Sequence, residues 1–177
     1  MSILLSIGLL CMILLILFRR SIIGALRIEN HVILQQLSKA KWYRNHWLGG
    51  LFLFMLNTVL FGGTLLALYI TTLFLIPYVH MVIMLLAVLL SVYLWSILGK
   101  AWQGDRSDRL KMGMVGGSFY LLLALLCMYG LVTLAPAYPG EDTFMSAIGF
   151  IFGIVVTTVA FVVCLMFTGF SRVRNEG

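Results

Sequence analysis

Five apolar runs alternate with polar segments along the chain. The runs cover residues 2–18, 48–76, 78–98, 112–134 and 144–170. A helix needs about 20 apolar residues to cross the roughly 30 Å hydrocarbon core of a bilayer, and tilt accommodates a longer helix. Each run approaches or exceeds that length. The pattern therefore predicts an all-α, polytopic membrane protein with five transmembrane helices.

The spacing of the runs predicts how the helices are paired. Pro77 separates the second run from the third with few residues to spare, which favours an antiparallel hairpin. The fourth and fifth runs predict a second hairpin. We therefore expect three parts: an N-terminal span at 1–18, a cytoplasmic helix at 19–46 and a four-helix transmembrane bundle at 47–177.

The basic residues predict the orientation of these spans. All 12 Lys and Arg residues follow the first, third or fifth run, and the connections near 77–80 and 135–143 contain none. Short loops rich in Lys and Arg stay on the cytoplasmic side. We therefore expect a multi-pass protein of the plasma or inner membrane, with its N-terminus outside and its C-terminus in the cytoplasm. Charge follows run 2–18 instead of preceding it, which favours a retained span over a signal peptide.

Composition places the chain among integral membrane proteins. Hydrophobic residues make up 62% and charged residues 10% of the sequence, and the mean hydropathy is +1.09. The net charge of +6 is best explained by loops that face anionic lipid headgroups, so no nucleic-acid partner is expected. The three cysteines lie within apolar runs and have neither metal nor disulfide spacing, so we expect no metal and no cofactor.

The segment 19–46 has the pattern of an amphipathic helix. One side of a helical wheel gathers Arg27, His31, Gln35 and Ser38. The opposite side gathers Ile22, Leu26, Ile33 and Leu37. Such a helix either lies in the inner membrane interface or packs against a protein partner. Polar interruptions of the apolar side favour the partner, which is another membrane protein or a second copy.

Small residues recur at four-residue spacing in three of the predicted spans. These residues are Gly63, Ala67 and Thr71, then Gly113 and Gly117, then Gly149, Gly153 and Thr157. Small residues at this spacing let helix backbones approach closely in a bilayer. The stripes therefore predict helix contacts, within one chain in preference to between two copies.

Few polar side chains lie at depth in the predicted spans. The fourth and fifth spans contain no ionisable Asp, Glu, Lys, Arg or His, which disfavours proton relays and ion-coupled transport. Asn57 is the most polar side chain at depth. We expect it to form an interhelical hydrogen bond, with Ser118 or Tyr120 as a candidate partner, in preference to contacting a substrate.

The densest charge occurs in the predicted cytoplasmic loop 99–112. It comprises Asp105, Arg106, Asp108, Arg109 and Lys111. Paired carboxylates and arginines of this kind are compatible with a metal or phosphate site in an intramembrane transferase. A structural role at the start of the fourth helix explains them better, because carboxylates complement exposed amides there. Asp142 or Thr143 is expected to begin the last helix in the same way.

These observations favour a non-enzymatic accessory or assembly subunit that binds other membrane proteins. The expected contact residues are Ile22, Leu26, Ile33, Leu37, Gly149 and Gly153. The alternative is a small permease or channel-like transporter of a neutral or apolar solute. Its polar pathway would include Asn57, Thr64 and Ser118. No residue is assigned to catalysis or to a cofactor.

Overall fold

The computed structural model describes residues 32–74, 78–136 and 142–170. Within these ranges every regular element is a helix. They are α3 (Val32–Lys39), the 3-10 helix η2 (Lys41–Arg44), α4 (His46–Leu73), α5 (Val79–Ala101), α6 (Arg106–Val132) and α7 (Phe144–Gly169). Four of them, α4 to α7, are long and apolar enough to cross a membrane. The predicted all-α class is confirmed for the described residues, and four of the predicted spans correspond to helices that could cross a membrane. The fifth span, at 2–18, lies outside the described residues, so the count of five remains a prediction.

The connection between α5 and α6 is shorter than the sequence pattern predicted. Helix α5 continues to Ala101 and α6 begins at Arg106, so residues 102–105 alone connect them. The predicted loop 99–112 was therefore wrong in extent. A drop in hydropathy shows where a chain leaves the apolar layer of the membrane, but it does not show where the helix ends. Residues 106–111 are polar and still helical, because backbone hydrogen bonds form whatever the polarity of the side chains.

Local side-chain hydrogen bonds mark two helix starts. The Asn45 side chain accepts a hydrogen bond from the Trp47 amide at 3.0 Å, at the N-terminus of α4. At the start of α7, Asp142 Oδ1 accepts from the Phe144 amide at 2.8 Å. Both bonds satisfy amides that a helix leaves without an internal partner. Asp105 precedes α6 without a side-chain cap bond.

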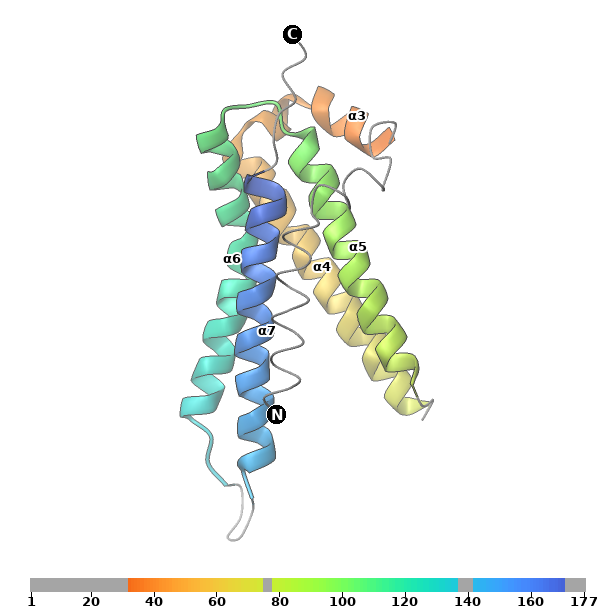
Figure 1. Cartoon of the computed structure of the whole chain (residues 1–177), viewed down its shortest axis with the longest axis vertical. Coiled ribbons are helices and arrows are strands. Elements are labelled where there is room, and N and C mark those ends of the chain that lie inside the picture. Colours follow the sequence, from red (N-terminus) through yellow and green to blue (C-terminus); the bar gives the residue numbers. More distant parts are fainter. Residues whose placement is uncertain (1–31, 75–77, 137–141, 171–177) are drawn as a thin grey trace.

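The four long helices form two hairpins that meet at one end and separate toward the other. Figure 1 shows α4 and α5 diverging from α6 and α7 below the end where α3 lies. Helix α6 packs most extensively against α7 and then against α4, while α3 contacts α5. The closed end of the bundle therefore holds most of the packed interior, and the opposite end leaves apolar helix surface exposed.

The core at the closed end joins η2 to the ends of α5 and α6. The Tyr43 ring packs edge-to-face on Trp102, with 5.8 Å between ring centroids. Its hydroxyl donates a hydrogen bond to the Leu98 carbonyl at 2.9 Å. Burial raises the pKa of the Tyr43 hydroxyl well above its usual range, because the phenolate would be desolvated. Tyr43 therefore stays a neutral donor that ties the interfacial segment to α5.

Glycines allow α4, α6 and α7 to approach closely. A Cβ atom added to Gly116 would lie 2.3 Å from Leu53 of α4, and one added to Gly50 would lie 2.7 Å from Val115 of α6. A Cβ added to Gly113 would lie 2.9 Å from Thr168 of α7. The α6 stripe therefore lies at helix contacts within the chain, as small residues allow in membranes.

Candidate functional site

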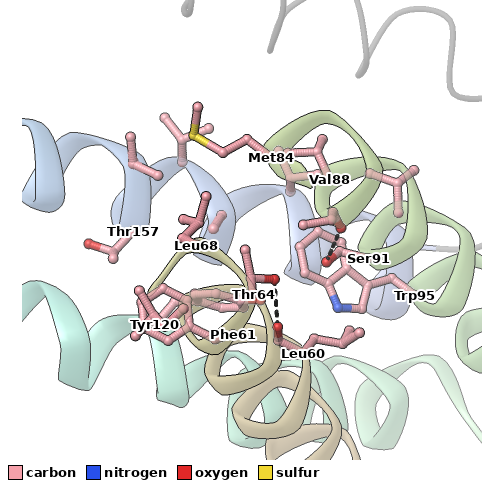
Figure 2. A pocket seen from close by; sticks show the side chains of 17 residues that line it. Leu60, Phe61, Thr64, Leu68, Met84, Val88, Ser91, Trp95, Tyr120 and Thr157 are labelled. Atoms are coloured by element: carbon pink, nitrogen blue, oxygen red, sulfur yellow. Dashed lines mark hydrogen bonds between the residues drawn. The ribbon is translucent and has the colours of Figure 1, made fainter. Parts of the chain in front are cut away.

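A cavity of about 380 Å³ lies between α4, α5 and α7, next to the aromatic ring of Tyr120 from α6. Its lining is almost entirely aliphatic and aromatic, and none of the lining residues is ionisable apart from Tyr120. Figure 2 shows Leu60 and Phe61 of α4, Met84 and Val88 of α5, and the other labelled side chains around this space. The cavity is therefore suited to binding an apolar group. Its lining contains no Asp, Glu, His, Lys or Arg side chain.

Two threonines and one serine line the cavity, and each of their hydroxyl groups is hydrogen-bonded to its own helix. Thr64 donates to the Leu60 carbonyl at 2.7 Å, and Ser91 donates to the Ala87 carbonyl at 2.8 Å; both bonds are drawn in Figure 2. Thr157 donates to the Gly153 carbonyl at 2.7 Å. Because these donors are used locally, the hydroxyls present mainly methyl and methylene groups to a molecule in the cavity.

Behind the cavity wall, the side chain of Asn57 connects the four long helices. It is fully buried. Its Nδ2 donates to the Gly116 carbonyl at 3.0 Å and makes a weak contact of 3.8 Å with the Cys164 sulfur. Its Oδ1 accepts from Trp95 Nε1 at 2.8 Å. The Asn57 amide thereby supplies an acceptor for the buried indole N–H of Trp95. Its contacts connect α4 to α5, to α6 and to α7.

The interhelical hydrogen bond expected for Asn57 is present, but its expected partners were wrong. Ser118 donates to the Val115 carbonyl of its own helix at 2.7 Å, and the Asn57 amide bonds a backbone carbonyl instead. Of the three residues suggested for a polar pathway, Thr64 alone lines the cavity. Asn57 and Ser118 do not line this cavity.

Of the contact residues expected in segment 19–46, Leu37 is the one whose side-chain surroundings the structure describes. Leu37, in α3, is half-buried and packs against the core of its own chain. Ile22 and Leu26 lie outside the described residues, and Ile33 belongs to α3 without a described side chain. Leu37 is therefore used, at least in part, within the chain.

Two expected contact glycines in α7 have different surroundings. A Cβ added to Gly153 would lie 2.9 Å from the Cys127 sulfur of α6, so this glycine is used within the α6–α7 pair. Nothing lies within 4 Å of a Cβ built on Gly149. The same open space surrounds Gly62 and Gly63 of α4. These three glycines have room for a contact that the described part of the chain does not provide.

The described charged residues near α6 form local contacts. Asp108 pairs with Lys111 at 3.1 Å and lies 3.8 Å from His46 Nδ1. Arg109 is buried, with 2% of its surface exposed, and its Nε has no hydrogen-bond partner among the residues that the structure describes. Among the described residues no group of three potential metal ligands was found.

Comparisons of the chain with protein-family models, with curated proteins and with solved structures found no match. The features of the described chain that bear on its function are the cavity and the open helix surfaces at Gly62, Gly63 and Gly149. The cavity itself was not anticipated from the sequence. The one signal that could have pointed to it is the series Phe61, Thr64, Leu65 and Leu68, which recurs at helical spacing on one side of α4.

Proposed function

We propose that this chain is a non-enzymatic accessory or assembly subunit that binds a transmembrane helix of another membrane protein. The contact surface is the outer side of α4 at Gly62 and Gly63. The open space around these two adjacent glycines, halfway along a membrane-spanning helix, is the observation that supports the proposal.

Gly62 and Gly63 differ from Gly50 of the same helix in what surrounds them. Glycine in a helix interior costs about 1 kcal/mol relative to alanine, because its backbone loses more freedom. At Gly50 that cost is offset by close packing, since a Cβ there would lie 2.7 Å from Val115. At Gly62 and Gly63 no neighbour within the described chain offsets it. A helix from a partner would fill the same role that α6 fills near Gly50.

The residues around Gly62 and Gly63 favour an apolar partner helix. Val59 and Leu66 are 71% and 60% exposed and lie one turn before and after the glycines. No Asp, Glu, Lys, Arg or His occurs between Leu48 and Leu73 of α4, so the surface has no ion-pairing group. Helices in lipid associate by close packing and hydrogen bonding, since lipid is as apolar as leucine. The fitting partner is therefore a helix whose own small residues allow close approach.

The test compares the same substitution on two open surfaces. Full-length protein carrying Gly63→Leu is purified from its native membrane in mild detergent, beside wild type and Gly149→Leu. We expect a stoichiometric membrane protein with wild type and with Gly149→Leu, and its loss with Gly63→Leu. Gly63→Ala should lower the recovery of the partner, because its methyl group would occupy the space that a closely packed partner helix needs.

Three outcomes would overturn the assignment. Recovery of no partner with wild type argues against an accessory role. Loss with Gly149→Leu but not with Gly63→Leu would move the contact to α7. Recovery of a second copy of the chain alone would make the surface a homodimer contact. Equal thermal stability of the purified variants is the control for folding.

The alternative is a permease for a neutral or apolar solute, and the cavity beside Thr64 is the one observation in its favour. A passage would need to continue past the closed end of the bundle. A cysteine at Thr64 that reacts with a water-soluble thiol reagent from either side of an intact membrane would support this alternative. Protection of that cysteine would argue against it.

A further inference from the structure

Exposed apolar side chains from two helices that belong to different hairpins line the cavity. Met84 and Val88 of α5 and Val156 of α7 are 46%, 51% and 61% exposed, and all three line the same cavity. The two hairpins that supply these walls diverge from the closed end (Figure 1). Two apolar helix surfaces therefore border a space that is open to a further apolar element.

We propose that this space is the docking site for the chain's own apolar run 2–18, which packs there as a helix between α5 and α7. The proposal is independent of the partner contact at Gly63, which lies on a different side of α4 from the lining residues. Side chains on one side of this helix would fill the cavity of about 380 Å³, so the same polypeptide would supply both the cavity and the group that fills it.

The length of the run and its tether support this occupant over others. Run 2–18 contains no charged side chain and would span about 26 Å as a helix, close to the thickness of the hydrocarbon core. Residues 19–31 connect it to α3, and α3 contacts α5, which is one wall of the cavity. A tethered segment meets its site at a high effective concentration, so it outcompetes an untethered helix of similar affinity.

The direction of the chain predicts which residues of run 2–18 would lie beside which residues of α5 along the helix axes. Helices α5 and α7 both end on the side of the molecule where α3 lies (Figure 1). Run 2–18 precedes α3 in the sequence, so a helix formed by it in this site would be expected to end toward the same side. As a helix, the run would place Cys11 about 10 Å from its end at Phe18. Ser91 lies about 10 Å from Leu98, the last large apolar residue of α5. Cys11 and Ser91 are therefore expected at the same depth.

The surfaces are also compatible in size and polarity. Ser6, Gly8 and Cys11 are small side chains within the run, and small residues allow helices to approach closely. On the cavity side, Ala87 and Ser91 are small lining residues of α5, and Ala160 is a small lining residue of α7. No ionisable group on either surface would be left unpaired by contact.

Disulfide crosslinking from the native Cys11 tests the proposal in the full chain. Cys127 and Cys164 are replaced by alanine, and a cysteine is introduced by Ser91→Cys or Ala160→Cys. Met114→Cys is the control, because Met114 is 53% exposed, belongs to α6 and does not line the cavity. Membranes are oxidised, and trypsin digestion followed by non-reducing mass spectrometry identifies the linked peptides.

We expect Ser91→Cys and Ala160→Cys to link to Cys11 within the monomer as the major product, and Met114→Cys to remain free. Links found only in dimer-sized species would show that a second copy fills the cavity, which overturns the proposal. No link at either position, in chains as thermally stable as the Met114→Cys chain, would also overturn it. Use of two positions on different helices keeps the test decisive if one variant fails to fold.

Discussion

Replacement of Asn57 by leucine should measure how strongly one amide holds the four helices together. The change removes two interhelical hydrogen bonds, from Trp95 Nε1 at 2.8 Å and to the Gly116 carbonyl at 3.0 Å. Such bonds average about 0.6 kcal/mol in a bilayer protein and reach about 1.7. The change also leaves the buried Trp95 N–H unpaired, at a cost of about 1–3 kcal/mol. Because these contributions overlap, we expect a loss of about 2–4 kcal/mol of unfolding free energy.

The assay uses a thiol that the fold hides completely. Cys164 has no exposed surface, so it reacts with a fluorogenic thiol reagent only after unfolding. With Cys11 and Cys127 replaced by alanine, its labelling reports the unfolded fraction across a denaturant series in mild detergent. Thr58→Val is the control, because the exposed Thr58 hydroxyl bonds only the Phe54 carbonyl of its own helix. It should change the unfolding free energy by less than about 0.5 kcal/mol.

A double-mutant cycle separates the hydrogen bond from general packing. Trp95→Phe alone leaves Asn57 Oδ1 buried without its donor, whereas the double variant removes both partners. We expect the double loss to be smaller than the sum of the single losses by about 1–2 kcal/mol. Additive losses, or an Asn57→Leu variant as stable as wild type, would refute the assigned role of this amide.

Two further predictions follow from the packing of α6. Gly116→Ala should lower the unfolding free energy by about 1–3 kcal/mol, because its Cβ would meet Leu53 at 2.3 Å. Adding Leu53→Ala should relieve that clash, and thermal unfolding that shows no loss with Gly116→Ala would contradict the packing. Arg109→Met should raise the unfolding free energy by about 1 kcal/mol or more, because an arginine buried to 2% exposure, with an unpaired Nε, is desolvated at a cost. A loss above about 3 kcal/mol would instead indicate that Arg109 has an ionic partner.

Hydropathy alone was sufficient to recognise the membrane class and to locate four of the predicted spans. The reason is that each span must bury its backbone polar groups within itself and present apolar side chains over about 20 residues. The polarity of Asn57 likewise marked it as an interhelical hydrogen-bonding residue. Its acceptor on α6 was not predictable, because Gly116 contributes a backbone carbonyl that every residue possesses.

Only the tertiary structure decided which side of each helix faces protein. Gly116 and Gly63 look alike in the sequence, yet one lies against Leu53 and the other has no neighbour within 4 Å. Lipid and protein interior are about equally apolar, so the buried and lipid-facing sides of these helices carry similar residues and little periodicity. The cavity between α4, α5 and α7 arises from the divergence of two hairpins, which depends on how closely their helices approach at the glycines of the closed end.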